Sequence, residues 1–272
     1  MSYAKVSSNL FKRFRPFFVQ VSDSKLFATP WCAPPETMTL GENEVHVWRA
    51  SLERPCSEIE ALKHHLAEDE LARADRFHFQ RHRTHFIVAR GLLRTILSRY
   101  LKMEPSRLRF RYGPKGKPEL AGDTSRRGLR FNVSHSHGLA LYAVTEDREI
   151  GVDVERIRSD VAGQKIAERF FSPREADALR QLPAEVRQKA FYTCWTRKEA
   201  YLKAIGEGIT LRLDQFEVST TPGEPAVLLS INGDSKEASY WSLKELNPER
   251  GYVGALAVKG HDWHMRCWNW EE

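Results

Sequence analysis

The chain has 272 residues, of which 41% are hydrophobic and 29% are charged. This is ordinary globular usage, which excludes a disordered, collagen-like or coiled-coil chain and leaves room for about two domains. No apolar run reaches the roughly 18 residues that a membrane-spanning helix needs. Four widely spaced cysteines without a CxxC pair exclude a zinc ribbon and a disulfide framework. We therefore expect a soluble cytoplasmic protein with reduced thiols.

The net charge of +6 is unevenly distributed along the chain. Residues 71–130 contain 16 lysines and arginines but only four acids, so the rest of the chain is acidic. A basic segment of this kind favours a polyanionic partner, whether a nucleic acid, a phosphorylated cofactor or an acidic protein. The alternative is a solvated basic surface that binds nothing.

The first half of the chain begins with residues 1–43, whose prolines and weak periodicity indicate an irregular lead-in. Ser57 followed by Glu60 has the pattern of a capping box, which predicts the start of a helix. Apolar residues at helical spacing predict the main helix of this half over 83–101. A strand is expected before these helices, at 45–49. Four more strands are expected after them, at 108–112, 129–133, 139–144 and 150–154.

The second half repeats this order of helices and strands. Ser172 and Glu175 form a second capping-box pattern around Pro173. A long helix is predicted from about 183 to 205, ended by Gly206 and Gly208. Further strands are expected at 216–219, 226–231, 240–243, 252–258 and 265–270.

Helices followed by strands in both halves predict two α+β units rather than a doubly wound parallel sheet. A weak echo between the two long helices supports a duplication. It matches Phe86, Arg90 and Arg94 with Phe191, Trp195 and Glu199 at the same spacing.

Three acids stand out as candidate ligands of a cation. Asp153 and Glu155 lie two apart in a strand, so both side chains leave the same face. Paired carboxylates repel and favour an oxygen-preferring cation, Mg²⁺ or Mn²⁺. Glu199 lies beside the buried face of the long helix, one turn before Lys203. The alternatives are two acids on an exposed strand face and a surface ion pair between Glu199 and Lys203.

Two polar turns are candidate anion sites. Residues 131–138 place Ser134, His135 and Ser136 between two strands, where hydroxyls and backbone N–H groups can bind an anion. No G-x-S-x-G sequence surrounds either serine, which argues against a hydrolase nucleophile. Lys115-Gly116-Lys117-Pro118 is a basic glycine turn without the spacing of a phosphate-binding Walker A loop.

Four of these segments, taken in order, resemble motifs of the 4'-phosphopantetheinyl transferase superfamily, specifically its larger Sfp-type members. They are Gly116-Lys117-Pro118, Phe131-Asn132-Val133-Ser134-His135-Ser136, Ile150-Gly151-Val152-Asp153-Val154-Glu155, and Phe191-x3-Trp195-x2-Lys198-Glu199-Ala200-x2-Lys203. The resemblance implies a monomer of two similar α+β subdomains related by a pseudo-twofold. Each would be a helix packed on a small, mostly antiparallel sheet, with the cofactor in the cleft between them. The subdomains would be residues 1–147, including the lead-in, and 148–272.

The resemblance also implies the reaction. The family moves the 4'-phosphopantetheine arm from coenzyme A to a serine of an apo acyl or peptidyl carrier protein, with Mg²⁺, and releases 3',5'-ADP. Asp153, Glu155 and Glu199 would hold the metal, with Mn²⁺ as an alternative to Mg²⁺. The catalytic residues would be Asp153, Glu199, which would accept the serine proton, and Lys203, which would also contact the pyrophosphate.

Further coenzyme contacts are implied for the first half. They are Arg73, Arg90, Lys117, Pro118, Ser134 and His135. Glu70 departs from the basic residue that some members carry there. The acidic carrier protein and the coenzyme phosphates would both suit the basic segment 71–130. A nucleic-acid-binding module or a metal-dependent phosphodiesterase remains the alternative, although no nucleic-acid-binding motif accounts for the three acids.

Overall fold

The computed structural model describes residues 30–122, 128–206 and 212–270. Most of the predicted lead-in, and Gly208 of the predicted helix end, lie outside these ranges. Within them, no helix is long and apolar enough to span a bilayer. All four cysteines are described and are free thiols.

The elements of the first half are β1 (Trp31–Cys32), β2 (Glu44–Ser51), α1 (Cys56–Lys63), α2 (Glu68–Ala74), α3 (Gln80–Leu101), β3 (Phe110–Tyr112), β4 (Pro118–Leu120), β5 (Leu129–Ser136) and β6 (Leu139–Glu146). Those of the second half are β7 (Ile150–Arg156), α4 (Gly163–Phe170), α5 (Pro173–Gln181), α6 (Ala184–Ile205), β8 (Phe216–Val218), β9 (Leu228–Ile231), α7 (Ser235–Ala238), β10 (Trp241–Leu246), β11 (Tyr252–Lys259) and β12 (His264–Asn269). The elements predicted for the first half are present in order, but the helix α2 and the strands β1 and β4 were not predicted, and β1 lies in the lead-in that was expected to be irregular.

The two halves share one topology. Each runs from a strand through short helices to a 22-residue helix, then through a small hairpin to two further strands. The strand order is β2-β6-β5 in the first half and β7-β11-β10 in the second, with antiparallel neighbours in both. This repeat confirms the predicted α+β fold with two similar halves.

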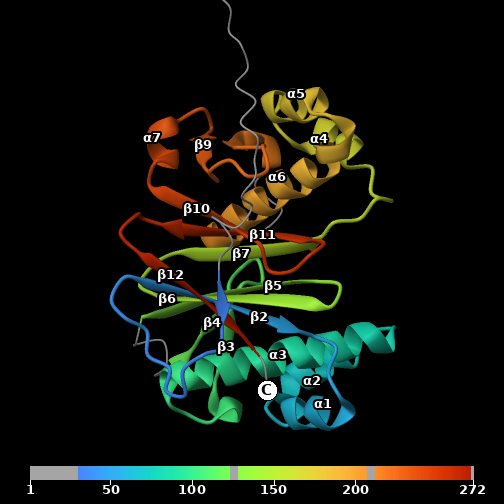
Figure 1. Cartoon of the computed structure of the whole chain (residues 1–272). Helices are drawn as coiled ribbons and strands as arrows, with labels where there is room; N and C mark the ends of the chain where they lie inside the picture. Colours follow the sequence, from blue (N-terminus) through green and yellow to red (C-terminus); the bar gives the residue numbers. More distant parts are fainter. Residues whose placement is uncertain (1–29, 123–127, 207–211, 271–272) are drawn as a thin grey trace, which may run out of the picture.

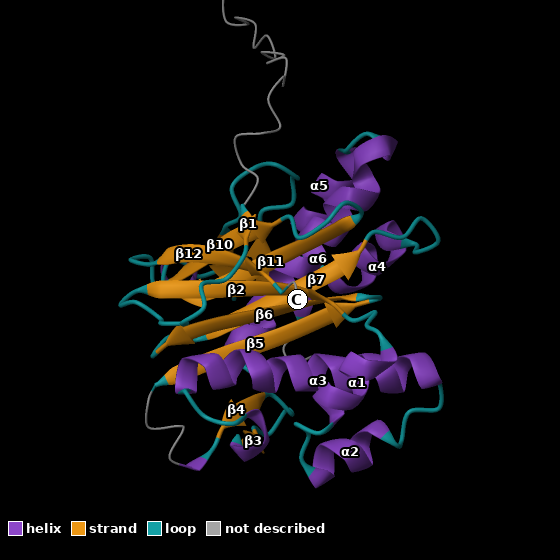
Figure 2. Ribbon diagram, turned by 60° about the horizontal axis from the view of Figure 1, so that its bottom comes forward, coloured by secondary structure: helices purple, strands orange, loops and turns teal. Residues whose placement is uncertain are grey.

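The halves stack as helix, sheet, sheet and helix (Figure 1). Leucines of α3, such as Leu93 and Leu97, pack on one face of the first sheet in a cluster with Trp48; Figure 2 shows α3 alongside β5 and β6. A second cluster lies between the sheets and joins Val152 of β7 to Leu141 of β6. A third lies between α6 and the outer face of the second sheet. These apolar layers fix the two sheets against each other.

The last strand returns to the first half. β12 pairs with β2 in parallel, and β1 pairs with the other edge of β12. The first sheet therefore has five strands, in the order β1-β12-β2-β6-β5. The predicted division of the chain between residues 147 and 148 stays a proposal. β12 follows that division in the sequence but pairs with a strand that precedes it.

The helix ends test the predicted capping signals. The Ser57 capping box was wrong: α1 begins at Cys56 after Pro55, and no side chain caps it. The second box is confirmed, since Ser172 accepts a hydrogen bond from the Glu175 amide. Gly206 ends α6 with a φ of 75°, the left-handed region that glycine tolerates best.

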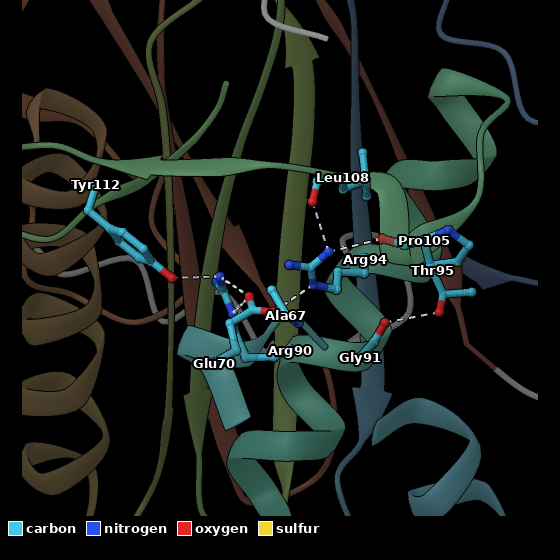
Figure 3. A network of polar contacts seen from close by, with 9 residues as sticks. All are labelled: Ala67, Glu70, Arg90, Gly91, Arg94, Thr95, Pro105, Leu108 and Tyr112. Atoms are coloured by element: carbon cyan, nitrogen blue, oxygen red, sulfur yellow. Dashed lines mark hydrogen bonds and ion pairs between the residues drawn. The ribbon is translucent and has the colours of Figure 1, made fainter. Parts of the chain in front are cut away.

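A buried charge cluster ties α2 to α3 in the first half (Figure 3). Glu70 accepts hydrogen bonds from Arg90 Nε at 2.8 Å and from Arg94 Nε at 2.7 Å. Arg94 also donates to the carbonyls of Pro105 and Leu108, which follow the helix. Burial raises the pKa of Glu70, but the charges of the two arginines outweigh it and bring that pKa below its ordinary value.

The second half contains the counterpart of this cluster. Lys198 of α6 lies 2.8 Å from Glu175 and donates to the carbonyls of Leu213 and Phe216, again just after the helix. Arg94 therefore corresponds to Lys198, and Cys194 is then the residue that corresponds to Arg90 in the repeat. The predicted echo matched Arg90 with Trp195, so its register is off by one residue.

We expect Glu70→Ala to lower the free energy of unfolding by about 3–5 kcal/mol, because it leaves Arg90 and Arg94 buried without a counter-charge. Glu70→Gln should lose less, since it keeps an acceptor. Urea unfolding measures both. Asp177→Ala, which removes an exposed ion pair with Arg180, is the control and should cost less than about 1 kcal/mol. An equal loss in the Asp177 and Glu70 variants would contradict this account.

Candidate active site

The site is organised by the close approach of α6 to β7. Gly151 faces the helix, and a Cβ atom there would overlap the carbonyl oxygen of Ala200 and the amide nitrogen of Ala204. Only glycine lets the helix backbone come this near. Because strand residues alternate, Asp153 and Glu155 leave β7 on the same face as Gly151. Their side chains therefore face α6.

Lys203 of α6 contacts both Asp153 and Ser134. Its Nζ lies 2.6 Å from Asp153 Oδ1 and 2.8 Å from Ser134 Oγ, so the site joins β5, β7 and α6. Ser134 Oγ donates to the same Asp153 oxygen at 2.8 Å. Asp153 is only 3% exposed, whereas Lys203 is half-buried. The structure thus brings Asp153, Ser134 and Lys203 together.

The three acids share one electrostatic environment. Burial and the negative charge of Asp153 raise the pKa of Glu155, against the opposing effects of Ser136 and Lys203. Burial and Asp153 likewise raise the pKa of Glu199, and Lys203 offsets part of that rise. The carboxylates therefore repel one another at this point, and the single lysine compensates incompletely.

The donor set fits a divalent cation in chemistry. Asp153 Oδ2 is buried and has no hydrogen-bond partner among the described residues. Carboxylate oxygens are hard ligands that suit Mg²⁺. In the ranges that the structure covers, however, no three His, Cys, Asp or Glu side chains converge as a ready-made metal cluster. The metal role of Asp153, Glu155 and Glu199 thus stays a prediction.

Lys117 joins the two halves. It extends from the turn before β4 and donates to the carbonyls of Ile150 at 3.1 Å and Ala204 at 2.9 Å. A pocket of about 420 Å³ lies beside it, lined by both halves, including Pro118 and Gly206. The pocket lies where β5 and β7 begin, and the three acids do not line it.

Burial lowers the pKa of Lys117 to about 8, from 10.5. Between about pH 8 and 10.5 the unfolded chain then binds more protons at this residue than the folded chain does, so stability should rise with pH. We expect wild type to gain stability relative to Lys117→Met over this interval, and no difference in slope below pH 7. Urea unfolding at pH 7 and pH 9.5 measures the change. Parallel pH profiles for the two proteins would contradict it.

The other predicted coenzyme contacts lie in the first half, and of these Ser134 alone donates a hydrogen bond to one of the three acids in the described part of the chain. The guanidinium of Arg73 lies over the ring of Phe86, and the side chain is exposed. Arg90 is 8% exposed and is engaged by Glu70 and by the hydroxyl of Tyr112. His135 is exposed at the edge strand β5. Desolvation by neighbouring atoms and the charge of Lys203 lower its pKa.

Ser136 was predicted only as part of an anion-binding turn and Asn132 only as part of a family motif, and the structure gives both of them partners in the site. Ser136 Oγ donates to Glu155 Oε2 at 2.7 Å, and Asn132 Oδ1 accepts the amide of Val152 at 2.8 Å. The available signal was the alternation of polar residues along 132–136, which puts three short polar side chains on one face of a strand.

Comparisons with known proteins match both halves of the chain. Residues 149–257 match the model of the 4'-phosphopantetheinyl transferase superfamily. Residues 47–147 match that of the 4'-phosphopantetheinyl transferase N-terminal region. The 4'-phosphopantetheinyl transferase HetI of Nostoc sp. is 45% identical over 88% of this chain and 98% of its own length. This chain belongs to the 4'-phosphopantetheinyl transferase superfamily.

Other members are more distant. The 4'-phosphopantetheinyl transferase Sfp of Bacillus subtilis is 28% identical over 78% of this chain and 91% of its own length. A solved structure, the holo-[acyl-carrier-protein] synthase of Thermotoga maritima, is 22% identical over 41% of this chain and 62% of its own, with a TM-score of 0.33. Membership in the superfamily confirms the predicted Sfp-type resemblance, the enzyme class and the reaction of 4'-phosphopantetheine transfer. It favours a transferase over the nucleic-acid-binding and phosphodiesterase alternatives.

Proposed function

We propose that this transferase uses coenzyme A as the donor and a serine of an apo acyl or peptidyl carrier protein as the acceptor. In this reaction the serine oxygen forms a bond to the β-phosphorus of coenzyme A. The bond from that phosphorus to the bridging oxygen breaks, and 3',5'-ADP leaves. The observation that carries the proposal is the joining of Asp153, Ser134 and Lys203 from three elements in a family member.

Asp153, Glu155 and Glu199 would hold Mg²⁺, with Mn²⁺ as the alternative. When bound, the cation would neutralise charge on the diphosphate. The buried, unpartnered Oδ2 of Asp153 supports this assignment. Lys203 is the one lysine that contacts these acids among the described residues, and its ammonium group would stabilise charge on the leaving phosphate.

Glu199 would accept the serine proton. Burial and the charge of Asp153 raise the pKa of Glu199, and a bound cation would oppose this rise. Glu199 lies on α6 one turn before Lys203, so its carboxyl group and the ammonium group of Lys203 lie on the same side of the helix.

Lys117, Pro118, Ser134, His135, Arg73 and Arg90 would contact the coenzyme. The pocket beside Lys117 supports the first two assignments, because it opens between the halves. The contacts of Arg90 with Glu70 and Tyr112 make its phosphate role the least supported of the six. An acidic carrier protein would suit the basic first half. We keep the monomeric state and the cytoplasmic location as proposals.

Intact-mass measurement tests the function. Apo carrier proteins from fatty-acid, polyketide and peptide synthesis are each incubated with the enzyme, coenzyme A and MgCl₂, and a parallel sample contains EDTA. The proposal expects the mass of one phosphopantetheine arm on the serine, with 3',5'-ADP released only when carrier is present. Release of 3',5'-ADP without a carrier would indicate hydrolysis instead, and no mass gain on any carrier would contradict the proposal.

A further inference from the structure

The backbone groups along the two edges of β7 find their hydrogen-bond partners in different ways. One edge pairs with β11 through an antiparallel backbone ladder. At the other edge, which lies against β5, the amides of Val152, Val154 and Arg156 donate to side chains of β5. Their acceptors are Asn132 Oδ1 at 2.8 Å, Ser134 Oγ at 3.4 Å and Ser136 Oγ at 3.3 Å. We name Asn132, Ser134 and Ser136 the polar ladder.

The polar ladder follows from the period of a strand. Alternate residues of β5 lie on one face, while Phe131 and Val133 on the other face pack with the α3 cluster. The amides of alternate residues of β7 likewise point to one edge. Side chains two apart therefore meet amides two apart. Buried backbone N–H groups need partners, so the contact between the two halves depends on these three side chains at this edge.

Two of the three members also hold the carboxylates of the site. Ser134 Oγ donates to Asp153, and Ser136 Oγ donates to Glu155. A hydroxyl has one hydrogen to donate and two lone pairs to accept with. Ser136 can therefore orient Glu155 and accept the Arg156 amide at the same time.

We propose that Asn132 and Ser136 are positioning residues of the transfer reaction, which rests on the proposed function. Asn132 fixes the start of β7 against the first half of the chain. Ser136 fixes the end of β7 and the direction of the Glu155 carboxylate. Neither residue needs to touch the coenzyme or the carrier for this role. Together they set the width of the site where β5, β7 and α6 meet.

Ser136→Ala is the main test, because it removes one hydroxyl from a strand without adding bulk. Loss of a hydrogen bond to a charged group should lower kcat about tenfold, while KM for coenzyme A stays within about twofold. Hydrogen exchange of the Arg156 amide, followed by NMR, should become about tenfold faster or more. Ser136→Thr keeps the hydroxyl and should restore both values to within about threefold. Asn132→Ala should accelerate exchange of the Val152 amide in the same way.

Ser242→Ala is the matched control. Ser242 lies on β10 and bonds Gly260 and His261, with no contact to the three acids. It should leave kcat and Arg156 exchange unchanged. The proposal is wrong if Ser136→Ala leaves either value unchanged, or if Ser242→Ala lowers kcat equally. Absence of transfer by wild type would refute the proposed function alone, since the exchange rates still report on the polar ladder.

Discussion

Asp153→Asn should lower the rate of transfer to a carrier protein by at least about 10³-fold. The substitution keeps the size of a side chain that is 3% exposed, but removes the charge that pairs with Lys203 and the proposed ligand of the metal. The loss should appear in kcat at saturating coenzyme A and persist when the Mg²⁺ concentration is raised. Intact-mass time courses of the carrier measure it.

The control for this variant is Asp177→Asn, an exposed acid of α5 that pairs with Arg180. It should retain wild-type turnover. Circular dichroism and thermal melting of both variants should show the wild-type fold, because Lys203 is half-buried and can be hydrated once it loses its partner. Turnover of Asp153→Asn within about tenfold of wild type would remove Asp153 from the catalytic residues.

Gly151→Ala should be the most disruptive single-methyl change in the described part of the second half. Overpacking of a core typically costs about 1–3 kcal/mol, and the atoms met here are helix backbone that cannot rotate away. We expect a loss of about 3 kcal/mol or more in the free energy of unfolding. Any folded fraction should transfer slowly, because α6 must move and carry Glu199 and Lys203 away from Asp153.

Gly138→Ala provides the comparison. A Cβ atom at Gly138 would lie 3.5 Å from the flexible side chain of Glu53, which is ordinary contact. Urea unfolding should place Gly138→Ala near wild type and Gly151→Ala far below it. Equal stabilities for these two variants would show that the approach of α6 to β7 does not depend on glycine at residue 151.

Much of the fold could be predicted because local patterns agree with the tertiary structure. The long helix α6, the glycine that ends it and the Ser172 capping box of α5 all lie where the sequence pattern predicts them. The Ser57 box did not form, since Pro55 already sets the start of α1. The three-residue strand β4 was missed because it is too short for alternation to stand out.

Long-range contacts explain what the sequence could not predict. The return of β12 to β2 joins segments more than 200 residues apart, and no local signal specifies it. Glu70 was noted only as a departure from the basic residue of some family members, whereas in the structure its two oxygens are held by Arg90 and Arg94 in the interior. Such a pairing depends on the crossing of α2 and α3, which composition does not reveal.

In the candidate site, too, local spacing predicted some features and long-range contacts decided the others. Alternation in β7 placed Asp153 and Glu155 on one face, and helical spacing placed Glu199 one turn from Lys203. The hydrogen bonds from Ser134 and Ser136 to these acids depend on how β5 meets β7. Their side-chain partners could therefore be identified only from the structure.

The central claim is that Asp153, Glu155 and Glu199 hold one divalent cation that also binds the diphosphate of coenzyme A. The most direct measurement is a crystal structure of the complex with coenzyme A and Mn²⁺, with the metal located by its anomalous scattering. The account predicts one strong peak coordinated by Asp153, at least one of the two glutamates and the diphosphate. A peak away from Asp153, or a diphosphate bound in the cleft without any metal at these acids, would contradict it.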